Sequence, residues 1–213
     1  KIIHYRGFDS WWPATSPLGP RPLPVGFPFC IGCPGRQGGV VQMTLRSLKN
    51  DNSRESVVSS LTQNNDPNII QEIIKLFDED DIEIRGEVFS TLLLNQNDIL
   101  KYLVLGLKHE SKNVRAYVSL VLANRDEKNA IKDIRELTND PSGLVRTCVY
   151  GALGHLEVKE SAKELHQGIF DSNLEVVKSA AYALARIDEK ISDKEIEELH
   201  KLGESEFEKI LKF

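Results

Sequence analysis

The sequence is poor in cysteine and has no long apolar run, and each shortage excludes a class of protein. Three cysteines, Cys30, Cys33 and Cys148, are too few for a fold held together by disulfides, and this scarcity is typical of a reducing, cytoplasmic setting. No apolar stretch reaches the roughly 18 residues that predict a membrane-spanning helix. We therefore expect a protein without a membrane partner.

Basic residues are also in short supply. The chain has 27 Lys and Arg against 32 Asp and Glu, a formal net charge of -5. Residues 1–42 hold four basic residues and one acid, so residues 43–213 carry 23 basic and 31 acidic groups. An acidic surface repels phosphate backbones. We expect no nucleic acid partner, and we expect a protein or peptide ligand that is basic if it is charged.

Proline is nearly absent after residue 34, since seven of the nine prolines lie in the first 34 residues. That density excludes helices and central strands. It predicts a Pro/Gly-rich, non-helical N-terminal extension over residues 1–42, outside a repeat fold that spans residues 43–213. Met43, the only methionine, resembles a native initiator and favours a leader upstream of it. Alternatively, the extension lies along the groove of the protein in polyproline II form.

From about residue 66 onward the sequence repeats itself at close to 31 residues. Two apolar columns carry this period most clearly: Val114, Val145 and Val176, and Leu122, Leu153 and Leu184. The repeated segments begin near Asp66, Asn97, Lys128 and Lys159. A fixed period of this length predicts an array of stacked supersecondary units.

Each segment contains two amphipathic helical patterns joined by a short polar turn. The turns at residues 78–81, 110–113, 139–143 and 171–173 are short enough to force antiparallel hairpins. One hairpin cannot cover its own apolar stripe, so each must stack on the next. We therefore predict an all-α fold: a right-handed α-α superhelix, or solenoid, of about five helical hairpins with capping helices at the C-terminus.

The turns resemble those of the HEAT repeat family, in the short form also found in phycobilin lyase-like proteins. The family places an Asp in the turn, followed five residues later by Val and then Arg. The four turns match this pattern to different degrees: Asp140, Val145 and Arg146 completely; His109, Val114 and Arg115 in all but the acid; Glu79, Ile84 and Arg85 conservatively; and Asp171 and Val176 without the Arg. The resemblance covers about residues 43–213 and implies a HEAT-like solenoid.

The acid and arginine columns predict a structural ladder, whose members are Asp140, Asp171, Arg85, Arg115 and Arg146. An acid in a turn can cap the unpaired amides at a helix N-terminus, and an arginine can bridge to the acid of the neighbouring repeat. The alternative is that the three arginines form an anion-binding stripe.

Two cysteine patterns bear on possible chemistry. Cys30 and Cys33 have the spacing of half a zinc site or a redox pair, but no second Cys or His pair follows at zinc-finger distance. Cys148 lies in an apolar helix column, where a core position is expected. We expect neither a metal nor a cofactor at these residues.

His109 and Glu110 resemble the His-Glu pairs of an iron-dependent HEAT-repeat hydroxylase. That family needs several such pairs facing each other across two halves, whereas His155 and Glu157 have a different spacing. One pair cannot hold two metal ions. We therefore expect His109 to replace the Asp of the capping column.

Together these patterns favour a non-enzymatic scaffold for protein-protein interaction. We expect a partner segment to bind on the concave face, lined by the second helix of each repeat. The candidate contact residues are Phe89, Ser119, Tyr150 and Tyr182, unless the aromatic ones merely fill the space between helices. No catalytic residue can be singled out. A HEAT-repeat enzyme with a hydroxylase-like metal site, or a phycobilin lyase-like protein, is the alternative function.

Overall fold

The structure, a computed structural model, describes residues 60–203 and Phe207. The N-terminal extension, with Cys30 and Cys33, lies outside the described residues, as do residues 43–59 of the expected repeat fold. Within the described part, every regular element is helical. None of these helices is long and apolar enough to cross a membrane.

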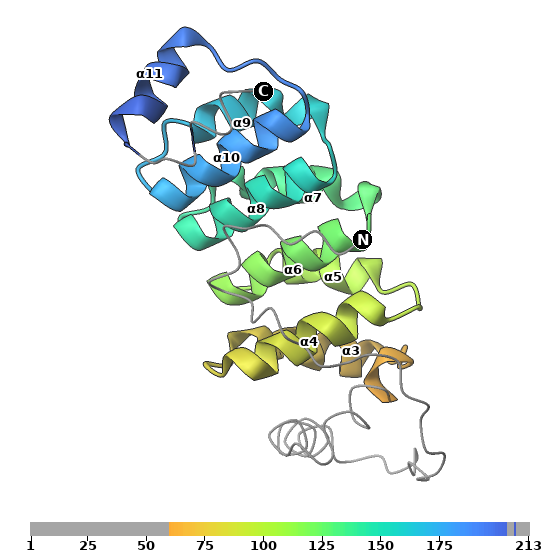
Figure 1. The fold of residues 1–213 in the computed structure, drawn as a ribbon. Coiled ribbons are helices and arrows are strands. Elements are labelled where there is room, and N and C mark those ends of the chain that lie inside the picture. Colours follow the sequence, from red (N-terminus) through yellow and green to blue (C-terminus); the bar gives the residue numbers. More distant parts are fainter. Residues whose placement is uncertain (1–59, 204–206, 208–213) are drawn as a thin grey trace, which may run out of the picture.

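Within residues 60–203, four helical hairpins follow one another along the array (Figure 1). Their bounds are α3 (Pro67–Lys75) with α4 (Ile82–Leu94), α5 (Leu100–Gly106) with α6 (Lys112–Asn124), α7 (Ile131–Glu136) with α8 (Gly143–His155), and α9 (Ala162–Gly168) with α10 (Leu174–Arg186). Helix α11 (Asp193–Lys201) comes last. Short 3-10 turns flank several helices: η1 (Leu76–Asp78), η2 (Lys128–Ala130), η3 (Leu137–Asn139) and η4 (Lys159–Ser161).

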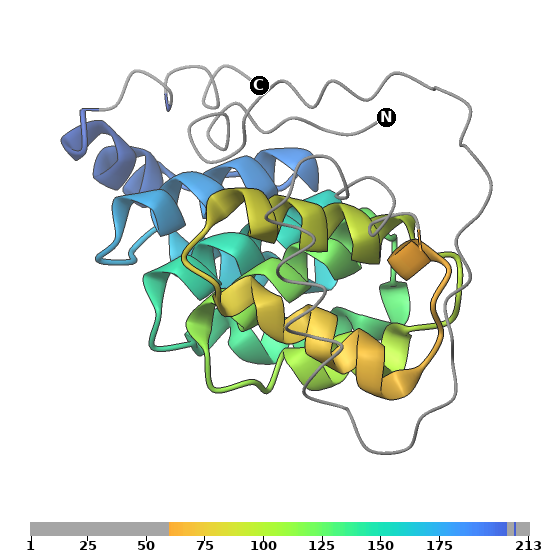
Figure 2. The same cartoon turned by 90° about the horizontal axis from the view of Figure 1, so that it is seen from below.

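The hairpins stack in two layers. The second helices α4, α6, α8 and α10 form one layer, and the first helices α3, α5, α7 and α9 form the other (Figures 1 and 2). The predicted all-α solenoid is thus confirmed. The solenoid follows from the sequence because the apolar columns recur every 31 residues, so that equivalent apolar residues of neighbouring hairpins pack against one another.

The core runs without interruption from one hairpin to the next. Val114, Val145 and Val176, the members of the valine column, are all fully buried, and so is the leucine column of Leu122, Leu153 and Leu184. Cys148 also lies inside, where burial raises the pKa of its thiol to about 12. The thiol is therefore a small apolar filler at neutral pH.

Short polar side chains start several of the helices by satisfying their free amides. The carboxylate of Asp66 accepts hydrogen bonds from the amides of Asn68 and Ile69, and the side chain of Asn173 accepts from those of Glu175 and Val176. Asp81 and Ser111 cap α4 and α6 in the same way. The hairpin turns are therefore encoded locally, before any contact between repeats.

Three second helices are followed by a residue with left-handed backbone angles, at the same position in each repeat. Asp126, Glu157 and Asp188 have φ values of 57°, 53° and 58°, and they are spaced by 31 residues. In each case the following amide donates back to a carbonyl five residues earlier, as from Glu127 to Leu122 at 3.0 Å. This is the bond of the Schellman motif, which closes a helix C-terminus. The C-termini of α6, α8 and α10 are thus closed by the same local hydrogen-bond pattern.

Candidate functional site

Arginine and aspartate side chains join successive hairpins at the edge where the hairpin turns lie. Arg115 of α6 donates two hydrogen bonds to the carboxylate of Asp140 in the next hairpin turn, from Nε at 2.7 Å and from Nη2 at 2.9 Å. Arg146 of α8 grips Asp171 in the same manner, at 2.7 and 2.8 Å. Two parallel bonds between guanidinium and carboxylate fix both distance and orientation. Each pair therefore locks one hairpin onto the next.

The turn backbone completes each joint. The remaining nitrogen Nη1 of Arg115 donates to the carbonyls of His109 and Glu110, and Nη1 of Arg146 donates to those of Asp140 and Pro141. Asp140 also accepts from the amide of Ser142 at 2.8 Å. One aspartate thus caps its own turn and binds the preceding hairpin. The arginines are thereby occupied by protein groups, which argues against an anion-binding stripe.

These contacts shift the titration of the paired groups. Burial by itself raises the pKa of Asp140, but the hydrogen bonds from Arg115 and Ser142 outweigh it, so the pKa lies below its ordinary value. The hydrogen bond from Arg146 is the largest cause that lowers the pKa of Asp171. The same bond raises the pKa of Arg146. Asp140 and Asp171 are therefore carboxylates at neutral pH.

Arg85 holds the corresponding position in α4, but its ladder contact is incomplete. Its Nη1 donates to the carbonyl of Glu79 at 2.5 Å, whereas its buried Nε has no hydrogen-bond partner among the described residues. His109 stands where the other repeats have the aspartate. The Nδ1 of His109 accepts from the amide of Ser111 at 3.1 Å, so the imidazole takes over the capping contact. It does not supply the carboxylate that Arg85 would grip.

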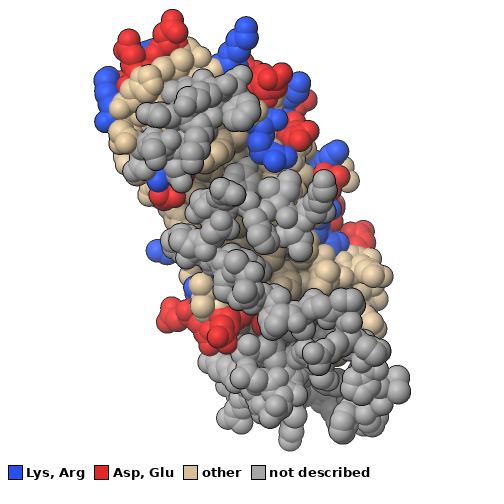
Figure 3. All heavy atoms as spheres, in the orientation of Figure 1, with Lys and Arg blue, Asp and Glu red and all other residues tan. Residues whose placement is uncertain are grey.

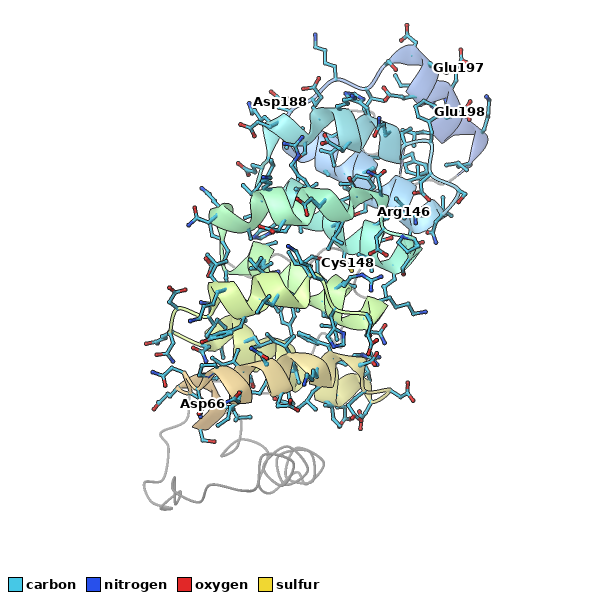
Figure 4. The ribbon with its side chains drawn as sticks, turned by 180° about the vertical axis from the view of Figure 1, so that it is seen from behind. Asp66, Arg146, Cys148, Asp188, Glu197 and Glu198 are labelled. Carbon is cyan, nitrogen blue, oxygen red and sulfur yellow. The ribbon has the colours of Figure 1, made fainter. Side chains whose placement is uncertain are left out.

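A second set of contacts between repeats lies at the opposite edge of the array and was not anticipated from the sequence. Nη1 of Arg125 donates to the carbonyls of Leu92 and Asn95 at the end of α4, and Nε of Arg186 donates to that of Gly154 at the end of α8. Figure 4 shows the two edges, with Arg146 on one and Asp188 on the other. In the sequence, the acids Asp126, Glu157 and Asp188 recur at this edge every 31 residues. Cationic side chains at helix C-termini are favourable because carbonyls there lack partners.

A shallow depression of about 410 Å³ opens beside the ladder, between the turns of the third and fourth described hairpins. Phe170 lies there with half of its surface exposed, and Nζ of Lys194 lies 5.4 Å from the centre of its ring. The depression is lined by Thr138, Asn139, Asp140, Pro141, Arg146, Tyr150, Gln167, Phe170 and Asp171. Because the ladder carboxylates are already paired, the free groups here are the amides of Asn139 and Gln167 and the exposed ring.

The candidate partner contacts do not all lie where the sequence analysis placed them. Ser119 is fully buried and donates its hydroxyl hydrogen to the carbonyl of Ala116, so it cannot meet a partner. Tyr150 is 4% exposed and lines the depression. Phe89 and Tyr182 are half-buried and pack against the core. The prediction is wrong for Ser119 because neighbouring helices cover a second helix on several sides.

The outward stripe of a second helix is best seen in α10. Glu175, Lys178, Tyr182 and Ala185 follow one another at helical spacing, and each is at least partly exposed. The other face of α10 is buried throughout, from Val176 to Leu184. Of the four candidate contacts, Tyr182 therefore lies on the outward side of a second helix.

No three His, Cys, Asp or Glu side chains among the described residues lie close enough together to hold a metal ion. His109 has its Nδ1 engaged by Ser111. Burial and the nearby charge of Arg186 lower the pKa of His155 below its ordinary value, which favours a neutral imidazole there. The two His-Glu pairs of the sequence are thus separate surface features of different repeats.

Acidic side chains gather over the turn between α3 and α4 (Figure 3). Residues 78–83 contain five acids and no basic residue. Ile82, in the same turn, is 46% exposed. This end of the described array therefore carries a strongly negative field.

The family model described as HEAT repeats matches residues 100–185. Among solved structures, a designed armadillo repeat protein in complex with the peptide (KR)4 is 17% identical, with a TM-score of 0.47 and coverage of 82% of this chain and 97% of that one. Two engineered proteins, 18% and 17% identical, cover 78% of this chain and 88% and 85% of their own, with TM-scores of 0.43 and 0.41. No curated protein matches the chain. The matched stretch, which runs from α5 into α10 and contains both Arg-Asp joints, is thus similar to HEAT repeats.

Proposed function

We propose that the chain is a non-enzymatic scaffold that binds a segment of a partner protein along the layer of second helices. HEAT-like solenoids are typical of protein-interaction scaffolds, because an extended stack offers many contact points to one ligand. The observation that carries the proposal is the two-bond arginine-aspartate joint at two successive boundaries. Paired Arg115-Asp140 and Arg146-Asp171 fix the spacing of the helices, and the stripe that includes Tyr182 and Ala185 is left outward.

The chemistry of the partner follows from the charge of the surface. A segment that runs along the second helices toward α4 meets the acidic turn of residues 78–83, where it would be attracted if it carries Lys or Arg. The exposed Ile82 in that turn, and Tyr182 at the other end, favour some apolar side chains as well. The proposed ligand is therefore a basic peptide segment with interspersed apolar residues.

A peptide array tests this proposal. The full chain is applied to 12-residue peptides of three matched classes, which are basic, acidic and uncharged polar. Binding should favour the basic class and weaken as salt is added, because exposed charges are screened. Equal binding to all three classes, or to none, would contradict the proposal.

The face is tested by a matched pair of variants. Ala185→Arg places a long cation in the outward stripe of α10, whereas Gln71→Arg places the same side chain on the exposed side of the first helix α3. Ala185→Arg should weaken the selected basic peptide about tenfold or more, which corresponds to about 1.4 kcal/mol. Gln71→Arg should leave its Kd unchanged. An equal effect of both variants would place the ligand elsewhere.

The catalytic alternative has its own test. A hydroxylase-like metal site at His109 and Glu110 would give purified protein with stoichiometric iron or zinc that His109→Ala removes. We expect no such metal, because Nδ1 of His109 already accepts from Ser111. Stoichiometric metal that depends on His109 would refute the scaffold and favour an enzyme.

A further inference from the structure

The depression beside the ladder is lined by two aromatic residues that the repeat pattern does not require. Phe170 stands 31 residues after Asn139, which is exposed and polar. Tyr150 stands 31 residues after Ser119 and 31 residues before Ala181. Neighbouring repeats thus fold with polar or small residues at both positions. The two rings therefore distinguish the place where the third and fourth described hairpins meet.

Both rings lie close to the end of α9. A Cβ atom at Gly168 would lie 2.9 Å from the ring of Tyr150, so this ring packs closely against α9. Phe170 follows two residues later, and half of its surface is exposed. Pro141, in the turn before α8, is exposed and lines the same depression. The depression therefore offers ring surfaces from two successive hairpins to a ligand.

Hydrogen-bond donors line the depression beside these rings. Asn139 and Gln167 are exposed, and the amide group of each side chain can donate. Burial raises the pKa of Tyr150 to about 12, and the charge of Asp171 adds to this effect. The phenol therefore stays protonated at neutral pH and is a further donor.

An uncharged, proline-rich segment in the polyproline II conformation suits this combination of rings and donors. Such a helix has no internal hydrogen bonds, so its carbonyls accept from side chains around it. It has about three residues per turn, so prolines three positions apart lie along one edge and can meet adjacent rings. A charged ligand gains less here, because Arg115 and Arg146 are already paired with Asp140 and Asp171.

The chain itself contains a segment of that kind. Residues 13–20 read Pro-Ala-Thr-Ser-Pro-Leu-Gly-Pro, without a charged side chain, and Pro17 and Pro20 stand three positions apart. The described chain begins near the end of α4, where the side chain of Asn95 donates to the carbonyl of Asn64 at 2.9 Å. Residues 21–59 can extend over about 130 Å, whereas neighbouring helices of a layer lie about 10 Å apart. The segment is therefore long enough to reach the depression.

We propose that residues 13–20 bind in this depression as a polyproline II helix. Pro17 and Pro20 lie against its two aromatic rings, and its side-chain amides donate to the carbonyls of the segment. The contact is made within one molecule and is separate from the partner face of the second helices. It fastens the N-terminal extension to the hairpin-turn edge of the array.

Photo-crosslinking of the full chain tests this contact. A benzophenone amino acid replaces Ser172, which is exposed in the turn beside the depression, or Glu110, the equivalent exposed residue two repeats earlier. Mass spectrometry should find residues 13–20 cross-linked to position 172 with a yield about fivefold or more above that at position 110, because docking raises the local concentration of the segment. Equal yields from the two positions, or none from position 172, would overturn the proposal.

A mixture of unlabelled and heavy-isotope-labelled chain identifies the source of the segment. The two cross-linked fragments should carry the same label, because they belong to one molecule. Pairs of fragments with different labels would show that the segment comes from a second copy, and would overturn the intramolecular contact.

Substitutions on both sides of the contact complete the test. Phe170→Ala removes the exposed ring and should lower the yield at position 172 about fivefold. Pro17→Ala combined with Pro20→Ala should lower it to a similar extent, whereas Pro28→Ala combined with Pro34→Ala should leave it unchanged. The proline variants lie outside the helical repeats, so they remain decisive if Phe170→Ala disturbs the fold. An equal loss in both proline pairs would contradict the binding of residues 13–20.

Discussion

Two helical glycines differ in the space around their Cα atoms. This difference decides whether a substitution by alanine destabilises or stabilises the protein. A Cβ atom at Gly168 would lie 2.7 Å from Cβ of Ala180 and 2.9 Å from the ring of Tyr150. At Gly151 the nearest atom is Oγ of Ser179, at 3.4 Å. The first contact cannot be relieved by turning a side chain, because Cβ of Ala180 is fixed to the backbone. Gly168 is therefore required where α9 packs on α10.

Gly168→Ala should lower the free energy of unfolding by about 1–3 kcal/mol, the usual cost of overpacking a core. Gly151→Ala should raise it by about 0.5–1 kcal/mol, because alanine loses less backbone freedom in a helix. Urea denaturation of the two variants and the wild type measures both changes. A loss of similar size in both would show that the backbone approach at Gly168 has no special role.

The left-handed residue Glu157 is the least suited of its column to that conformation, since Asp and Asn tolerate it better than Glu. Glu157→Gly should stabilise the protein by about 0.5–1 kcal/mol in thermal or urea unfolding. The exposed pair of Glu157 with Arg186, 3.3 Å apart, contributes little. Glu157→Ala is the matched control, because it removes the same pair and keeps the Cβ atom. If alanine stabilised as much as glycine, backbone strain would not be the cause.

At the scale of a single element, the turn between α5 and α6 offers a joint that can be completed. An aspartate in place of His109 could still accept from the amide of Ser111 and would also reach the unpaired Nε of Arg85. We expect His109→Asp to stabilise the protein by about 1 kcal/mol, a modest gain because the acidic turn lies nearby. Chemical denaturation measures it.

A double-mutant cycle identifies the source of that gain. In an Arg85→Met background His109→Asp should no longer stabilise, because the carboxylate then has no guanidinium to grip. A gain of the same size in both backgrounds would assign the effect to capping alone. The cycle thus separates capping of the turn from pairing with an arginine, the two contacts that Asp140 makes in the next repeat.

The sequence predicted the elements whose signals are local or strictly periodic. The valine column and the polar turns identified the hairpins, because these positions are buried or capped in every repeat. Ser119 was misplaced, because its outward or inward orientation depends on how closely the flanking helices approach. Asp126, Glu157 and Asp188 were missed as structural positions, because exposed acids resemble ordinary surface residues until their backbone angles are known.

Over the whole molecule, the carboxylates that join repeats share one direction of pKa shift. The pKa values of Asp140, Glu164, Asp171 and Glu195 all lie below their ordinary values, since hydrogen bonds to cations, amides or hydroxyls outweigh burial. Groups of this kind stabilise the fold above the ordinary carboxyl pKa, and the contribution is lost as the pH falls through the folded value. The array should therefore weaken at several boundaries together in acid.

We expect the free energy of unfolding to fall steadily as the pH is lowered from about 5 to 3, the range of carboxyl titration. Asp171→Asn should cost about 2–3 kcal/mol at pH 7, less than a fully buried pair because the side chain of Arg146 is partly exposed. Its stability should then depend less steeply on pH than that of the wild type. Denaturation at each pH gives both slopes, and parallel slopes would remove Asp171 from the acid response.

Each ladder pair spans 25 residues and crosses a single boundary, as from Arg146 to Asp171. A tandem duplication of residues 128–158 would therefore bring its own arginine, its own turn acid and its own helix-ending residue, all already in phase. The added unit would find the same neighbours on both sides. The number of repeats can thus change one unit at a time by duplication, because each added unit makes the contacts that already exist between neighbouring repeats.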